Sequence, residues 1–164
     1  MSDHLVFMMG QFEAQFPTDR KYAKNHMWAQ AGGQAAWLPE GEGGTQATWR
    51  FGFAAYAVRL LQDVYFLDWI VAAGAQVRER QQIGAIESKK AESDLFSPIA
   101  GRLTIFNEEL LSDPSAINVD KYRQGWLFEI DGLGHELLTP EQYLQHLDCV
   151  WEVTQRTIKG QLND

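Results

Sequence analysis

The sequence predicts a mainly β fold, a small sandwich or flattened barrel with one helix at each end of the chain. One observation is a series of short segments rich in aromatic and β-branched residues, spread between residues 27 and 130. Another is that glycine and proline separate these segments, as they do at turns. The third is that apolar residues recur at helical spacing near both chain ends. With 164 residues, 45% of them hydrophobic, the chain can build one ordinary domain.

The first predicted element is a helix within an N-terminal extension, residues 1–19. Ser2 can cap this helix and Pro17 can end it. The apolar side chains that recur at helical spacing between them are Leu5, Met8, Met9, Phe12 and Phe16. We expect this helix to lie on the main body of the protein.

Three strands and a short helix are predicted next. The strands span residues 27–31, 48–53 and 64–70, and the helix spans 54–61. In the second strand Trp49, Phe51 and Phe53 alternate along the chain, which indicates one buried face. A long loop with five glycines, residues 32–46, precedes that strand.

The stretch from Ile83 to Leu103 predicts a tight hairpin. Two short apolar strands flank its tip, and the tip presents Lys89 and Lys90 away from the core. Strands at residues 103–106 and 126–130, with a helical turn at 108–111 between them, complete the predicted β core.

The C-terminal segment, residues 133–164, predicts an amphipathic helix packed on that core. Thr139, Pro140 and Gln142 combine a capping hydroxyl, a proline at the first helical position and a glutamine that completes a capping box. The apolar residues that then repeat on one face are Tyr143, Leu144, Leu147, Val150, Trp151 and Ile158.

The charge of the chain restricts its partners and its location. There are 22 acidic and 14 basic residues, a formal net charge of -8, which argues against binding nucleic acid or an anionic membrane surface. The start of the chain carries charged residues and no export pattern, and charges interrupt the most apolar window, residues 54–74. We therefore expect a cytoplasmic protein.

Several residues that could form other sites are interpreted as structural. The single cysteine, Cys149, excludes an internal disulfide and is expected to be a small buried residue of the C-terminal helix. The histidines have no mutual metal-ligand spacing, so no metal is predicted, and His26 is expected to be a structural strand residue. Trp126 and Trp151 are assigned to core packing, and the sequence contains no pattern typical of a catalytic triad.

The chemistry of the hairpin tip depends on its two lysines. For an arbitrary Lys-Lys pair the plain interpretation is a solvated turn. A carrier arm needs a reachable amine on a stiff, exposed support, and a tip between two buried strands meets these demands. The nearby carboxylates of Glu87, Glu92 and Asp94 favour protonated amines. A catalytic lysine, which would need burial, is therefore the weaker interpretation.

The residues around the tip resemble a known modification motif. Glu87-Ser-Lys-Lys-Ala-Glu-Ser-Asp94 is similar to the Glu-Ser-Val-Lys-Ala-x-Ser-Asp lipoylation motif of the glycine cleavage H-protein family. Aligning the two places the modified lysine on Lys90, with Lys89 where the family usually has valine. The segments at residues 21–28 and 106–130 also resemble family patterns, including Asn-Glu-x-Leu and Gly-Trp-Leu/Phe.

This resemblance implies a biotinyl/lipoyl-type hybrid barrel-sandwich over residues 20–132, and a carrier rather than an enzyme. It implies lipoate in amide linkage on Lys90, as N6-lipoyllysine, and a lipoate-attachment enzyme that recognises the surrounding motif. The motif residues are Glu87, Ser88, Ala91, Ser93 and Asp94. In glycine cleavage such a carrier serves the decarboxylase, the folate-dependent aminomethyltransferase and dihydrolipoyl dehydrogenase.

The region from Ala54 to Gly74 departs from the usual family pattern, because it lacks a threonine, a glycine before aspartate and a proline. The run from Ala55 to Trp69 resembles H-protein-like lipoate-binding proteins that work with a heterodisulfide-reductase-like complex in bacterial sulfur oxidation. We therefore predict a carrier of sulfur or electrons for that complex. The alternatives are the H protein of glycine cleavage, which carries an aminomethyl group, and an unmodified interaction module with the same fold.

Overall fold

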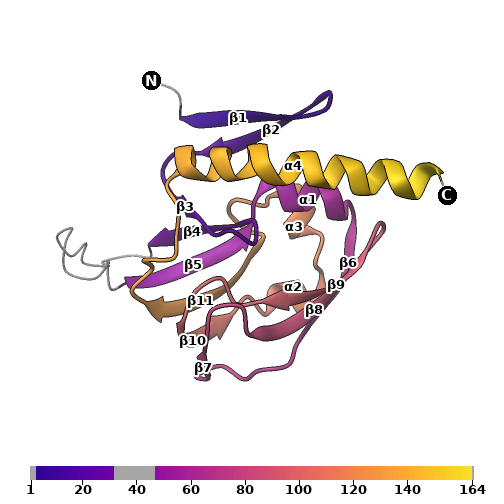
Figure 1. The fold of residues 1–164 in the computed structure, drawn as a ribbon. Helices are drawn as coiled ribbons and strands as arrows, with labels where there is room; N and C mark the ends of the chain where they lie inside the picture. The colour runs from indigo at the N-terminus through magenta and orange to yellow at the C-terminus, as the bar shows by residue number, and fades with distance from the viewer. Residues whose placement is uncertain (1–2, 32–46, 164) are drawn as a thin grey trace.

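Antiparallel sheets make up most of the molecule, and the long C-terminal helix lies across the top of the two main sheets (Figure 1). The computed structural model describes residues 3–31 and 47–163, with side chains up to Thr154. The predicted loop at 32–46 and the side chain of Ile158 therefore lie outside the described residues.

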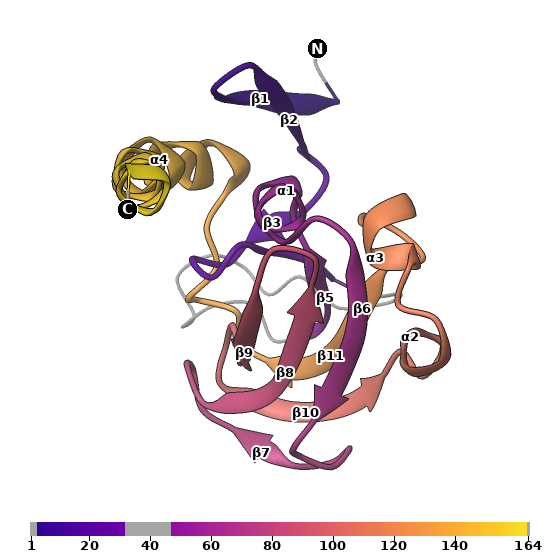
Figure 2. The same cartoon turned by 90° about the vertical axis from the view of Figure 1, so that its right-hand side faces the viewer.

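Two sheets form the body of the fold. The larger has the order β3-β4-β5-β11-β10-β7, and its strands are β3 (Lys21–Tyr22), β4 (Met27–Ala31), β5 (Ala47–Phe53), β7 (Gln76–Val77), β10 (Gly101–Phe106) and β11 (Trp126–Gly132). The smaller has the order β6-β8-β9, and its strands are β6 (Val64–Trp69), β8 (Gln82–Ser88) and β9 (Glu92–Phe96). Figure 2 shows the smaller sheet lying against the larger one.

The main hydrophobic core lies between these two sheets. The alternating aromatic residues of β5, Trp49, Phe51 and Phe53, are all buried in it. Ile83 and Ile86 of β8 enter the same core from the smaller sheet. The buried face predicted for β5 is therefore confirmed. The predicted mainly β fold is confirmed by the two sheets as a whole.

Most of the predicted elements between residues 27 and 130 are present. The three strands predicted at 27–31, 48–53 and 64–70 match β4, β5 and β6 to within one residue at each end. The predicted helix is α1 (Ala55–Leu61), and the predicted helical turn is α2 (Glu109–Ser112). The sequence does not predict α3 (Ala116–Val119), β3 or β7, which are too short to show a periodic pattern.

The N-terminal extension is a β-hairpin, so the helix predicted within residues 1–19 is wrong. β1 (His4–Met9) pairs with β2 (Phe12–Pro17). Buried and exposed side chains alternate along both strands, so the strand period of two prevails over the helical spacing of the same apolar residues. Gly10 has a φ of 66° in the tight turn, a conformation that glycine adopts without steric cost.

The hairpin, α1 and α4 (Pro140–Asn163) form a second layer over the sheets (Figures 1 and 2). Phe16 of β2 is fully buried there, with its ring centroid 5.9 Å from that of Tyr22 and 5.4 Å from that of Tyr143. The rings of Tyr22 and Tyr143 stack on each other at 4.8 Å. This second hydrophobic cluster joins the N-terminal hairpin to the C-terminal helix.

The predicted capping box of α4 is confirmed. The N–H of Gln142 donates to Thr139 Oγ at 3.2 Å, and the N–H of Thr139 donates to Gln142 Oε1 at 3.0 Å. Cys149 is exposed, so the prediction that it is buried is wrong. It follows the buried Leu147 by two residues, which places it on nearly the opposite side of the helix. Among the described residues no helix, α4 included, is long and apolar enough to cross a membrane.

Candidate functional site

The predicted hairpin tip lies between β8 and β9, and both of its lysine side chains are exposed. Ser88 closes the tip. Its N–H donates to Ala91 O at 2.8 Å, its hydroxyl donates to the same oxygen at 3.1 Å, and the N–H of Ala91 donates to Ser88 Oγ at 3.2 Å. Lys89 and Lys90 are therefore held on a tight, hydrogen-bonded turn.

A second set of hydrogen bonds fixes the tip to the start of β6. The N–H of Lys89 donates to Asp63 O at 2.8 Å. Asn118 secures the chain on either side of Asp63, because its amide donates to Gln62 O at 2.5 Å and accepts from the N–H of Val64 at 3.0 Å. The sequence does not predict this support. The available signal was that Asn118 belongs to a segment that resembles the family pattern.

The predicted attachment motif divides into outward and inward side chains. Glu87, Ser93 and Asp94 are exposed, and Ala91 is half-buried. Ser88 is buried, and its hydroxyl is used in the hydrogen bonds of the turn. This side chain is therefore not on the surface that an attachment enzyme would contact. The exposed carboxylates beside the lysines give the tip the acidic surroundings that the sequence predicts.

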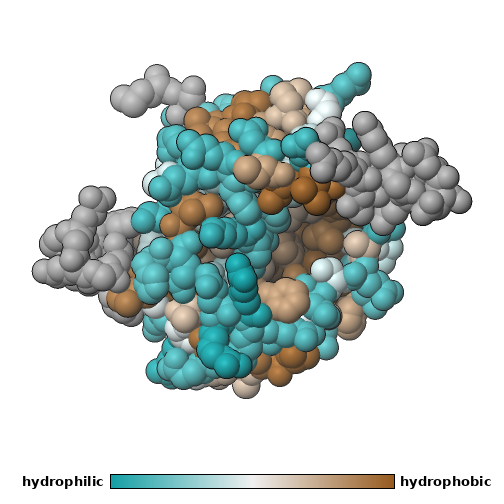
Figure 3. Space-filling view, viewed as in Figure 1, coloured by the Kyte–Doolittle hydropathy of each residue, from teal (hydrophilic) through white to brown (hydrophobic). Residues whose placement is uncertain are grey.

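A pocket of about 340 Å³ lies beside the hairpin, between β9 and the second layer. Figure 3 shows it as a hollow with apolar walls below α4. Its walls are mainly apolar and include Phe53, Leu60, Leu61, Ile86 and Phe96. Its polar lining residues are Lys24, Asn25, His26, Ser93 and Asp94. The strand that follows the lysines therefore forms one wall of the pocket.

His26 lines this pocket, and it lies in the turn before β4 rather than in the strand itself. Its Nδ1 atom is 2.8 Å from the hydroxyl oxygen of Tyr143, and its ring lies 4.4 Å from that of Tyr56. Burial, and then the nearby His146, lower the pKa of His26 to about 4. The ring is thus neutral near pH 7, which agrees with a structural role.

Comparison with known proteins gives one consistent result. A family model described as Glycine cleavage H-protein matches residues 20–149. The glycine cleavage system H protein of Rubrobacter xylanophilus is 35% identical over 137 residues, which cover 82% of this chain and 97% of that protein. The corresponding protein of Neisseria meningitidis serogroup B is 35% identical over 136 residues, covering 80% of this chain and 96% of its own.

A solved structure is similar in both fold and sequence. The crystal structure of a glycine cleavage system H protein from Mycobacterium marinum has a TM-score of 0.65 and 31% sequence identity, covering 78% of this chain and 95% of that chain. All three relatives carry the glycine cleavage description, so they favour that interpretation over the predicted sulfur-oxidation one. This chain belongs to the glycine cleavage H-protein family.

Proposed function

We propose that this protein is a lipoyl carrier of glycine cleavage, with lipoate attached through an amide to Lys90. The observation that carries the proposal is the exposed lysine on a turn closed by Ser88 and fixed to Asp63. A rigid, exposed support makes the amine reachable for an attachment enzyme and leaves the attached arm free to move. The family supports the choice of lipoate, because H proteins are lipoyl carriers and not catalysts.

Lys90 is preferred over Lys89 for two reasons. The motif alignment places the modified residue on Lys90. The backbone N–H of Lys89 is bonded to Asp63 O, so Lys89 lies on the side of the turn that is fixed to β6. The exposed side chains of Glu87, Ser93 and Asp94 would supply the surface that the attachment enzyme recognises.

The pocket beside the hairpin fits the arm that Lys90 would bear. Ser93 lies three residues beyond Lys90, within about 10 Å along the strand. When bound, lipoate would supply the dithiolane that receives and releases the aminomethyl group. The apolar walls suit its hydrocarbon part, and Asn25 and Asp94 bring an amide and a carboxylate that can accept hydrogen bonds from an amine.

The partners that this function requires are the glycine cleavage decarboxylase, the aminomethyltransferase and dihydrolipoyl dehydrogenase, besides the attachment enzyme. The carrier's own residues hold, expose and shelter the arm, and the bond-making steps belong to those enzymes. The acidic tip suits partners whose docking surfaces are basic.

The attachment site can be tested by intact mass measurement of protein from lipoylation-competent cells. We expect one lipoyl group on the wild type and on Lys89→Ala, and none on Lys90→Ala. Because both side chains are exposed, neither change should affect folding, which makes Lys89→Ala a matched control. A lipoyl group that persists on Lys90→Ala would contradict the assignment.

The pathway is tested separately by reconstitution. The lipoylated protein is mixed with glycine decarboxylase and labelled bicarbonate, and incorporation of label into glycine is followed. We expect exchange at a rate similar to that of an established H protein, and only background exchange with Lys90→Arg. A lipoylated protein that supports no exchange would refute the glycine cleavage role and reopen the sulfur-oxidation interpretation.

A further inference from the structure

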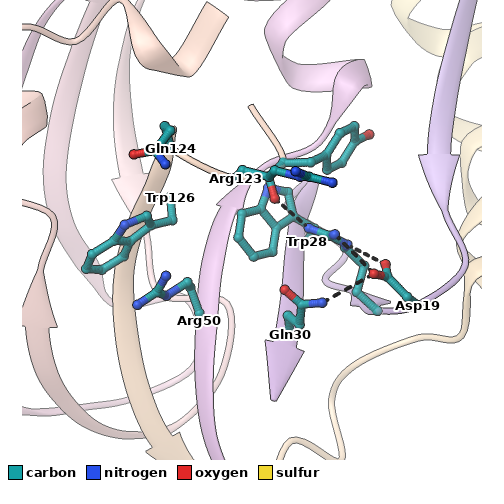
Figure 4. A pocket seen from close by; sticks show the side chains of 9 residues that line it. Asp19, Trp28, Gln30, Arg50, Arg123, Gln124 and Trp126 are labelled. Carbon is teal, nitrogen blue, oxygen red and sulfur yellow. Dashed lines mark hydrogen bonds and ion pairs between the residues drawn. The ribbon is translucent and has the colours of Figure 1, made fainter. Parts of the chain in front are cut away.

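A second pocket, of about 440 Å³, lies on the face of the larger sheet that points away from the main core (Figure 4). Arg50 of β5 is directed to this face because its neighbours Trp49 and Phe51 enter the core. Gln30 of β4 lies opposite Arg50 in the strand register, and Trp126 of β11 also lines the pocket. The site is thus built on three adjacent strands.

A glycine shapes the base of this pocket. A Cβ atom at Gly52 would lie 2.6 Å from the indole ring of Trp28, so the absence of a side chain lets that ring lie flat on the sheet. The indole N–H of Trp28 donates to Lys121 O at 2.8 Å, which fixes the loop that carries Arg123. Trp126, assigned to core packing from the sequence, is half-buried: it packs against the second hydrophobic cluster and also lines the pocket.

Three guanidinium groups line the pocket, and they are held to different degrees. Arg20 is the most fixed: its side chain is 7% exposed, it pairs with Asp19 at 2.8 Å, and it donates to Tyr122 O at 2.9 Å. Arg50 stacks on Trp126, with its Cζ atom 4.1 Å from the ring centroid, and pairs with one oxygen of Glu129 at 2.9 Å. Its side chain is still 41% exposed.

Arg123 is the third, and it is exposed. Among the described residues its guanidinium makes no hydrogen bond or ion pair. The one carboxylate that lines the pocket, Asp19, is already bound to Arg20, and Glu129 is bound to Arg50. The pocket therefore has unused cationic donors and no free carboxylate, in a chain whose net charge is -8.

We propose that this pocket binds the carboxylate or phosphate group of a small anionic ligand. Guanidinium groups present N–H donors in a planar arrangement that matches both kinds of oxyanion. Arg50 and Arg123 would donate to the oxyanion, and Arg20 would act as a positioning residue through Trp28 and Tyr122. The site does not involve Lys90, so this proposal stands apart from the carrier function.

The proposal can be tested by NMR titration of the full-length ¹⁵N-labelled protein. Sodium phosphate and sodium citrate are added in separate experiments, with sodium chloride keeping the ionic strength constant. The signals followed are the indole N–H of Trp126 and the side-chain Nε–H of Arg50. We expect saturable shifts of both signals with at least one of the two anions, and the anion that saturates identifies phosphate or carboxylate as the preferred group.

Variants locate the binding. Arg123→Gln should weaken the affinity at least about tenfold, because a charged hydrogen bond contributes about 1.5–3 kcal/mol. Arg50→Gln should do the same, and Arg78→Gln, at an exposed site in another turn, should leave the affinity unchanged. Arg123 is exposed, so its variant remains a valid test even if Arg50→Gln fails to fold. Shifts that stay linear with both anions, or equal affinities for Arg123→Gln and Arg78→Gln, would overturn the proposal.

Discussion

The Nδ1 atom of His26 lies 2.8 Å from the hydroxyl oxygen of Tyr143, which joins the turn before β4 to the C-terminal helix. His26 lines the pocket beside the β8–β9 hairpin, and Tyr143 belongs to the second hydrophobic cluster, which holds the N-terminal hairpin. The contact therefore connects the pocket with the second layer of the fold. His26 adopts a φ of 69°, so the turn places its ring at some conformational cost.

Acid should destabilise this protein through His26. The pKa of His26 is lowered to about 4 in the folded state, against about 6.5 in an unfolded chain. Between these values the unfolded chain binds the proton and the folded protein does not. The contribution of His26 to the free energy of unfolding is therefore fully present above pH 6.5, and it is lost as the pH drops towards 4. The contribution of His26 to this loss should be about 2–3 kcal/mol. Urea unfolding from pH 7.5 to 4.5 measures it.

A substitution isolates that contribution from those of the carboxylates. His26→Asn keeps a residue that tolerates positive φ and can bond Tyr143, but it cannot titrate. Its stability should change less with pH than that of the wild type. His135→Asn, at a side chain that is 63% exposed, should retain the wild-type dependence. Identical pH profiles for the wild type and His26→Asn would show that His26 does not titrate as described.

Ser88→Ala should loosen the hairpin tip. The change removes the hydroxyl that bonds both the N–H and the oxygen of Ala91, and it leaves the N–H without that acceptor. We expect a loss of about 1 kcal/mol in the free energy of unfolding and a slower rate of lipoyl attachment. Ser112→Ala is the matched control, because Ser112 is an exposed serine at the end of α2 and lies outside the attachment motif. An attachment rate equal to that of Ser112→Ala would contradict the role given to Ser88.

Gly52→Ala should be far more costly than an alanine at a less crowded glycine. The new Cβ would meet the Trp28 ring at 2.6 Å, and that ring is buried and bonded to Lys121. We expect a loss of about 2–3 kcal/mol in the free energy of unfolding. A Cβ atom at Gly10 would lie in open space, and only the positive φ of this residue disfavours alanine. Gly10→Ala should therefore lower the free energy of unfolding by about 1 kcal/mol. Denaturant unfolding compares the two, and equal losses would indicate that Trp28 moves aside.

Phe16→Ala should destabilise the whole molecule, and not just its N-terminal hairpin. Phe16 is fully buried against Tyr22 and Tyr143, and truncation of a buried phenylalanine costs about 3–5 kcal/mol. Val6→Ala, on the exposed face of the same hairpin, should cost less than about 0.5 kcal/mol. If the hairpin instead detaches alone, Phe16→Ala will lose protection of its β1 and β2 amides from hydrogen exchange while α4 stays protected.

Features that depend on neighbouring residues could be predicted from the sequence. The alternation of Trp49, Phe51 and Phe53 predicts a strand with one buried face because successive side chains point to opposite sides. Thr139 and Gln142 predict the start of α4 because the capping box closes within one helical turn. The exposed position of Lys90 follows in the same way from the short turn between two apolar segments.

The N-terminal segment shows where such local patterns are ambiguous. Its apolar residues satisfy both a helical and a strand period, and the hairpin prevails because it buries Phe16 against residues from β3 and α4. Cys149 illustrates a related difficulty, because the face of α4 that is buried depends on how the helix docks.

By itself, the sequence determined the main core strands, the capped C-terminal helix and the exposed lysine, since each of these follows from a pattern within a few residues. Only the tertiary structure decided that Asp63 and Asn118 support the tip and that Arg50 and Arg123 share a pocket. These groups are far apart along the chain and meet through strand pairing and packing. Local periodicity carries no information about which distant segments will meet, because that choice depends on the burial of apolar surface by the whole chain.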